Sequence, residues 1–174
     1  MTDADAHPRR PSLDGARPAV ADSAFVSNQS YLVGDVTVAE RASVWPFVCA
    51  RGDTDPVEIG AETNVQEFSM IHASRLGDRV TVGHNAVVDD ATIESDVLVG
   101  MQSAVLRGAT VESNSIVAAG AVVLQGQTVP GGHLAYGTPA ETRPLEDDQV
   151  AQIEQHWRHY VERVGQYKAE GHFE

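Results

Sequence analysis

The chain has 174 residues, which is enough for one domain with a sizeable core. Its 25 acidic residues against 12 basic ones give a formal net charge of −13, which argues against binding to a nucleic-acid backbone or to an anionic membrane surface. Of the basic residues, only Lys168 is a lysine, and we interpret so acidic and lysine-poor a chain as adapted to high salt (halophilic). The alternative is an ordinary acidic cytoplasmic protein.

Residues 1–17 are polar and contain proline, without the apolar segment of a signal peptide. They predict a flexible N-terminal arm. The single cysteine, Cys49, excludes an internal disulfide and suits a reducing compartment. No apolar run approaches the length of a membrane span. We therefore expect a cytoplasmic protein with no membrane or nucleic-acid partner.

Aliphatic residues recur every six positions through most of the chain, with a three-residue insertion near Asp55 and single deletions after Ile71 and Val88. A period of six fits neither a helix nor a simple alternating strand. It fits three short strands per coil, each with one aliphatic residue pointing inward. We therefore predict a mainly β protein, a parallel β-helix of about six coils over residues 18–132. The hexad residues are Val20, Val26, Leu32, Val38, Val44, Ala50, Ile59, Val65, Ile71, Leu76, Val82, Val88, Ile93, Val99, Val105, Val111, Val117, Val123 and Val129.

Residues 133–174 predict a turn followed by a C-terminal helix. Within 146–168, apolar residues at helical spacing form one stripe, and Pro144 stands where a helix can start. Because a solenoid needs its open ends covered, we expect this helix to cap the prism. A partner-binding groove is the alternative interpretation of the stripe. Its residues are Val150, Ile153, Trp157, Val161 and Val164.

Polar residues that follow inward positions point outward. By the repeat, Arg51, His72 and Asp89 stack on one face in successive coils, while Gln66 and His84 lie on the preceding face. The side chains of one prism therefore diverge, but His84 of one chain can meet His72 and Asp89 of the next. The spacing predicts a homotrimer with three sites between subunits. The alternative is a pair of solvated surface histidines.

The segment RGDTDPVEIGAETNVQEFSMIHASRLGDRVTVGHNAVVDDATI (51–93), with VGMQSAVL (99–106) and HLAYGTPAETRPL (133–145), resembles the gamma-class carbonic anhydrases. The resemblance implies a left-handed β-helix, a zinc ion and reversible hydration of carbon dioxide to bicarbonate by a metal-bound hydroxide. It also implies a role for each matching residue. Arg51 and Asp53 match interface residues, Asn64 and Gln66 match the Asn-x-Gln motif whose glutamine orients the bound water, and His72 and His84 match metal ligands.

The third ligand departs from the family pattern, because Asp89, followed by Asp90, stands where the family has a histidine. An aspartate cancels one unit of the ion's charge, so a bound water becomes a weaker acid. Two histidines and a carboxylate also suit ferrous iron. Glu67 is a candidate proton relay or a solvated charge. Tyr136 either approaches the site or packs beneath the helix.

The sequence is also compatible with two other functions. A hexapeptide acyltransferase shares the repeat, but between Ile93 and Val129 the chain offers one basic residue, Arg107, for the phosphates of coenzyme A. A non-catalytic trimeric scaffold of the carbonic anhydrase family would retain the interface after losing the third ligand, and Asp89 is the residue that favours it.

Overall fold

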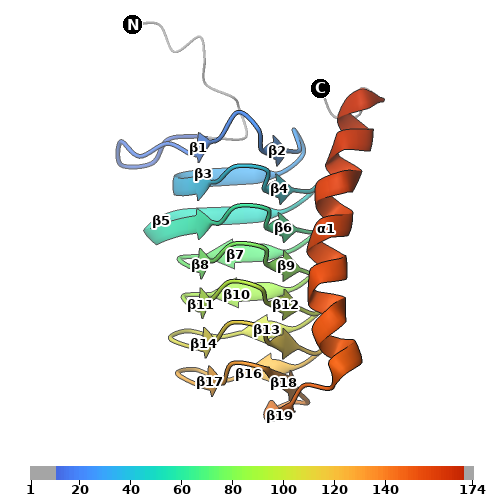
Figure 1. The fold of residues 1–174 in the computed structure, drawn as a ribbon. Coiled ribbons are helices and arrows are strands. Elements are labelled where there is room, and N and C mark those ends of the chain that lie inside the picture. The colour runs from blue at the N-terminus through green and yellow to red at the C-terminus, as the bar shows by residue number, and fades with distance from the viewer. Residues whose placement is uncertain (1–10, 171–174) are drawn as a thin grey trace, which may run out of the picture.

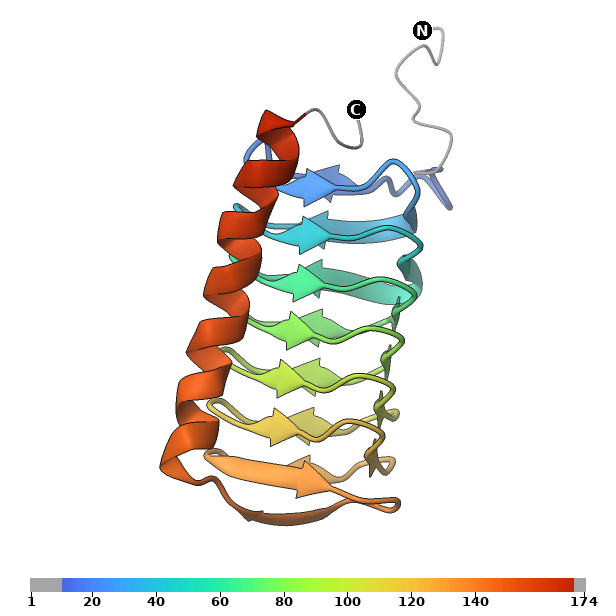
Figure 2. The same cartoon turned by 90° about the vertical axis from the view of Figure 1, so that its right-hand side faces the viewer.

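The computed structural model describes residues 11–170. Most of the arm predicted for residues 1–17 lies outside this range. No helix in the described part of the chain combines the length and the apolarity that a membrane span requires. Short parallel strands wind into a β-solenoid of about six coils, and one long helix runs along its side (Figures 1 and 2).

Two faces of the solenoid belong to one hydrogen-bonded sheet and the third face is a separate sheet. In the larger sheet, β16-β13-β10-β7-β5 forms one face and β5-β8-β11-β14-β17 forms the next. Beyond this path, β3 pairs with β5 and β1 pairs with β3. The third face has the order β19-β18-β15-β12-β9-β6-β4-β2. The strands are β1 (Ala19–Val20), β2 (Phe25–Val26), β3 (Tyr31–Val38), β4 (Ser43–Val44), β5 (Cys49–Ile59), β6 (Asn64–Val65), β7 (Met70–His72), β8 (Arg75–Leu76), β9 (Thr81–Val82), β10 (Val87–Asp89), β11 (Thr92–Ile93), β12 (Leu98–Val99), β13 (Ala104–Val105), β14 (Thr110–Val111), β15 (Ile116–Val117), β16 (Val122–Val123), β17 (Thr128–Val129), β18 (His133–Tyr136) and β19 (Glu141–Pro144).

The hexad residues form the core. From Leu32 to Val129 every one of them is at most 2% exposed, while Val20 and Val26 are partly buried against them. Each short strand supplies one inward aliphatic side chain, and this side chain packs against those of the neighbouring coils. The prediction of a β-helix from the period of six is confirmed. Pairing continues slightly further than residue 132, because β18 pairs in parallel with β15 through residues 134 and 135.

The corner between the third face and the face that carries β7 and β10 is turned by residues with positive φ. These are Phe47 (63°), Phe68 (64°), Asn85 (58°), Gln102 (58°) and Gly120 (69°) in successive coils. Asparagine and glycine adopt this conformation readily, whereas phenylalanine does so at a cost. The corner is the element that positions His84, which directly precedes Asn85.

The helix α1 (Asp147–Ala169) lies along the third face and runs back from the last coil to the first (Figure 2). The expectation that it caps an open end is wrong. Its 23 residues span about 35 Å, and seven stacked strands span about 29 Å, so the helix matches the height of the solenoid.

Two apolar patches on the third face hold the helix. Ile153 packs with Ile116 and Leu134 near the last coils. Val164 packs with Phe25 and Trp45 near the first coils. The predicted stripe is therefore confirmed at Ile153 and Val164.

One member of the predicted stripe does not face the solenoid. Val150 is 48% exposed, because α1 contacts the third face along a line through Ile153 and Val164 instead. The expectation that Val150 packs against the prism is wrong.

Candidate functional site

Three strands of one face align the first group of predicted site residues. Arg51 on β5 pairs with His72 on β7, and His72 pairs with Asp89 on β10. The column predicted from the hexad is thus confirmed, because each residue follows a buried inward position of its strand. All three side chains project from the outer surface of the same face.

Side-chain contacts link this column to a fourth residue. His72 Nδ1 lies 2.7 Å from Asp89 Oδ1, and His72 Nε2 lies 3.2 Å from Asp53 Oδ1. Arg51 donates two hydrogen bonds to Asp53 Oδ2, at 2.9 and 2.7 Å. The bonds from Arg51 hold the pKa of Asp53 below its usual value. The resemblance places Asp53 at a subunit interface. Within the single chain, Asp53 also contacts His72, so the His72 imidazole lies between the carboxylates of Asp53 and Asp89.

The second group lies around the corner, on the third face. His84 Nδ1 is 2.8 Å from Glu67 Oε2. Gln66 Nε2 donates to Asn64 Oδ1 at 3.1 Å, and Asn64 Nδ2 donates to Thr81 Oγ1 at 2.8 Å. Gln66 and Asn64 are both almost fully buried. This chain of hydrogen bonds commits the amide nitrogen of Gln66 and so fixes the orientation of its side chain.

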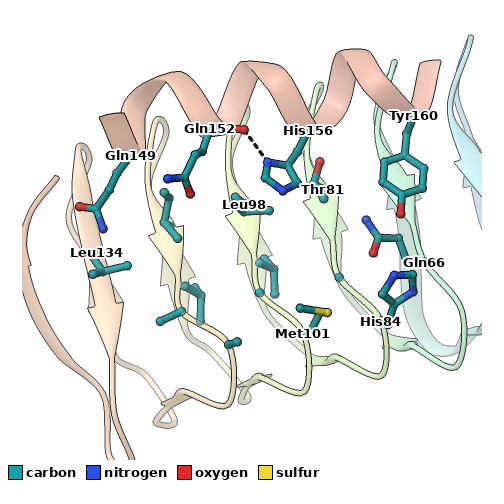
Figure 3. A pocket seen from close by; sticks show the side chains of 17 residues that line it. Gln66, Thr81, His84, Leu98, Met101, Leu134, Gln149, Gln152, His156 and Tyr160 are labelled. Carbon is teal, nitrogen blue, oxygen red and sulfur yellow. Dashed lines mark hydrogen bonds between the residues drawn. The ribbon is translucent and has the colours of Figure 1, made fainter. Parts of the chain in front are cut away.

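A groove of about 490 Å³ lies between α1 and the third face, along the stretch where the two are not in direct contact, and it reaches Gln66 and His84 (Figure 3). Its floor is aliphatic, with Leu98 among the residues that line it, and the helix contributes polar side chains that include His156 and Tyr160. None of the described residues that line it is a lysine or an arginine, which disfavours the phosphates of coenzyme A as its occupant.

Two helical residues at this groove were missed by sequence reasoning. His156 Nδ1 donates to the Gln152 carbonyl at 2.7 Å (Figure 3), and because a carbonyl only accepts, Nδ1 carries the proton. Burial raises the pKa of the Tyr160 hydroxyl, and the charge of Glu67 raises it further. Neither residue belongs to a sequence motif. Both line the groove because α1 runs along the side of the solenoid.

One chain does not assemble a complete metal site. Within residues 11–170 no three histidine, cysteine or acidic side chains converge as a metal-binding group. The donor types nevertheless fit: imidazole nitrogen and carboxylate oxygen suit zinc and ferrous iron, and His72 and Asp89 already lie side by side. His84, the third residue that matches a family ligand, lies apart from this pair, on the neighbouring face of the same chain.

Tyr136 is not brought to either group within the chain. It is 39% exposed at the end of β18, and β18 lies three strands from β9 in the order of the third face. The packing role beneath the helix also finds no support in so exposed a side chain.

The chain is similar to known proteins over most of its length. A family profile described as the hexapeptide repeat of succinyl-transferase matches residues 91–125. A carbonic anhydrase of Geobacillus kaustophilus is 40% identical over 161 residues, covering 89% of this chain and 88% of the relative. The protein YrdA of Escherichia coli is 38% identical over 167 residues, covering 88% and 91%. The crystal structure of a hexapeptide transferase family protein from Anaplasma phagocytophilum matches with a TM-score of 0.88 and 30% identity, covering 90% of this chain and 96% of that one.

Fold and repeat together define a hexapeptide-repeat protein. Within that class, the extent of the similarity to the relatives named carbonic anhydrase shows the family. The chain belongs to the gamma carbonic anhydrase family of hexapeptide-repeat proteins.

Proposed function

We propose that the protein hydrates carbon dioxide reversibly to bicarbonate, at sites between the subunits of a homotrimer. The observation that carries this proposal is the contact between His72 and Asp89 at the positions of two ligands of the family. Relatives named carbonic anhydrase support the chemistry. We expect the activity to be weak, because Asp89 replaces a neutral imidazole.

In this site, His72 and Asp89 of one chain and His84 of the next would hold a zinc or ferrous ion. The ion supplies positive charge that makes a water molecule more acidic. Gln66, whose amide nitrogen is held by Asn64, would orient the reacting oxygen from the third face. The aliphatic groove beside Gln66 and His84 offers an uncharged path by which carbon dioxide reaches it.

The outer surface beside the His72 column supports contact with another chain. Its neighbouring outward column is apolar, with Met70, Val87 and Ala104 as successive partners. At the adjacent corner, Phe47 and Phe68 stack with ring centroids 5.1 Å apart and are 52% and 62% exposed. An exposed apolar strip of this kind indicates an interaction surface.

Metal content is the first test of this proposal. Protein purified without chelator or affinity histidines is expected to contain about one zinc or iron per trimer interface, and chelation is expected to remove carbon dioxide hydration. Elemental mass spectrometry and stopped-flow assays measure the two quantities. Protein that remains free of metal after soaking with zinc and with ferrous iron would contradict the proposal.

Mixed trimers test whether the site is shared between chains. His72→Ala and His84→Ala proteins are each expected to lack hydration activity. Random mixed trimers of the two should regain about one quarter of the native sites, because an intact site needs His72 from one chain and His84 from its neighbour. No recovery after mixing, in samples shown by light scattering to be trimers, would contradict a site shared between chains, because it would mean that a working site takes both histidines from one chain.

A non-catalytic scaffold is the second candidate function. The observation that favours it is that both ring nitrogens of His72 contact carboxylates, Asp89 and Asp53, so that the cluster is satisfied without an ion. A trimer that binds no metal would select this candidate.

A further inference from the structure

The groove beside Gln66 and His84 has two chemically different sides. Its floor contains aliphatic side chains such as that of Leu98, whereas its helical wall contains hydrogen-bonding side chains such as those of Gln152 and His156 (Figure 3). At about 30 Å³ for each water molecule, the groove volume of about 490 Å³ has room for several. We expect this water along the helical wall, because the aliphatic floor offers it no partner. The wall therefore provides a hydrogen-bonded route between the site and the solvent.

Few groups in the groove can take up a proton. Its described lining contains no aspartate, glutamate, lysine or arginine, and its titratable side chains are those of His84, His156 and Tyr160. His84 is assigned to the ion in the proposed function. The pKa of the Tyr160 hydroxyl is raised by burial and by the charge of Glu67, so this group keeps its proton at neutral pH. His156 remains as the groove residue that can both accept and release a proton, because imidazole changes its charge near neutral pH.

The His156 ring is oriented for this task. Its Nδ1–H donates to the Gln152 carbonyl at 2.7 Å, so Nε2 carries the lone pair in the neutral ring. No residue in the described part of the chain hydrogen-bonds to Nε2, and the ring points from α1 toward the strands (Figure 3). The residue is half-buried, so a proton taken up from the groove can pass on to the solvent.

His156 also lies close to the end of the groove at which the reaction is proposed. It precedes Tyr160 by one turn of α1, a rise of about 6 Å. Tyr160 in turn stands above Gln66 and His84 (Figure 3). Hydrogen-bonded oxygens lie about 2.8 Å apart, so a short chain of water molecules spans a separation of this size.

We propose that His156 is the proton relay of the site. Hydration consumes one water molecule and one carbon dioxide molecule and yields bicarbonate and one proton. Nε2 of His156 takes up this proton through water in the groove, and the imidazolium then gives it to a base in the solvent, which restores the neutral ring. This inference rests on the proposed function and assigns the exit of its proton. Glu67, the relay considered from the sequence, is less suited, because its Oε2 is sealed from solvent beside His84.

Turnover in dilute buffer tests the relay. Because Asp89 lowers the positive charge at the site, the reacting water loses its proton less readily, and we expect proton release to limit kcat. His156→Gln should lower kcat at least about tenfold and leave kcat/KM unchanged, and concentrated imidazole buffer should restore kcat. His156→Ala is a second variant with the same expected result.

His133→Gln is the matched control. His133 Nδ1 makes the same kind of contact, 2.8 Å from the Gly131 carbonyl, and the residue is half-buried as His156 is. It is absent from the described lining of the groove. Its replacement should therefore leave both kcat and kcat/KM unchanged in dilute buffer.

Nuclear magnetic resonance of metal-free protein labelled with ¹⁵N in histidine provides a measurement that is independent of activity. The His156 signals, assigned by their loss in His156→Gln, should show the proton on Nδ1 in the neutral ring and the gain of a second proton on Nε2 upon acidification. A neutral ring with its proton on Nε2 would overturn the inference, because Nε2 would then have no lone pair to offer. Chelator competition should show the same affinity for zinc in His156→Gln as in the native protein.

The kinetic outcomes separate the relay from the proposed function. If the native protein hydrates carbon dioxide and His156→Gln keeps its kcat in dilute buffer, the relay is wrong and the shared site stands. A parallel loss of kcat/KM, or no rescue by imidazole, would also overturn the relay, because a structural role produces that result. A loss of kcat in Glu67→Gln that imidazole rescues, with His156→Gln unaffected, would assign the relay to Glu67 instead. If the native protein loaded with zinc or with ferrous iron hydrates no carbon dioxide, both proposals fall.

Discussion

Asp89→His is expected to increase carbon dioxide hydration near neutral pH by about tenfold. The substitution removes one negative charge from the ligand set, and a decrease of one unit in the pKa of a bound water corresponds to about a tenfold change in its deprotonated fraction. The larger imidazole has room, because the Asp89 side chain is 39% exposed. Stopped-flow assays of zinc-loaded protein measure the change in kcat, and competition with a chelator measures the affinity for zinc.

The neighbouring residue provides a matched control. Asp90→His introduces the same side chain at a position with positive φ (47°), where the native carboxylate lies 3.2 Å from Arg107, and it should leave activity unchanged. A loss of both zinc affinity and activity in Asp89→His would contradict the expectation. It would mean that aspartate is the working ligand in this protein.

Trp45→Ala is expected to lower the free energy of unfolding by about 3–5 kcal/mol. Trp45 is 3% exposed, and its ring lies 5.3 Å from Phe25, 5.5 Å from Tyr160 and 5.2 Å from Tyr167, measured between centroids. It joins the first coils to the C-terminal half of α1. Its loss should therefore loosen the helix as well as leave a cavity. Denaturant unfolding measures the first effect, and hydrogen exchange of residues 160–168 measures the second.

Trp157→Ala is the control for this experiment. Trp157 lies in the same helix, stacks on Arg158 and belongs to none of the buried clusters, so its removal should cost much less. Unchanged exchange in residues 160–168 of Trp45→Ala would show that other contacts anchor the helix.

The coils were predictable because one rule repeats along the chain. Each hexad residue fills the same inward position, so an insertion near Asp55 or a deletion after Ile71 shifts the register without erasing it. The path of α1 was not predictable in this way. It depends on two outward apolar patches, one around Trp45 and the other around Ile116, and outward positions carry no fixed pattern of their own.

The same distinction between features set by the repeat and features set by tertiary packing applies to the candidate site. Counting coils was enough to align Arg51, His72 and Asp89, because strand pairing transmits the register of the inward residues. The contact between Glu67 and His84 depends on how the corners turn, and the position of Tyr160 in the groove depends on the docking of the helix. Both are tertiary effects that leave no periodic signal in the sequence.

The return of α1 to the first coil changes how the chain completes its fold. In a simple repeat protein each unit touches only its neighbours, so the ends fray independently. Here Lys168 Nζ lies 3.3 Å from the carbonyl oxygen of Ala24, so the last helix is fastened to the first coil. During synthesis the coils emerge in order, yet the earliest ones must wait for the C-terminal segment before they gain their outer aromatic contacts. The contact between α1 and the first coil is thus formed last, and loss of order at either end of the chain destabilises the other end.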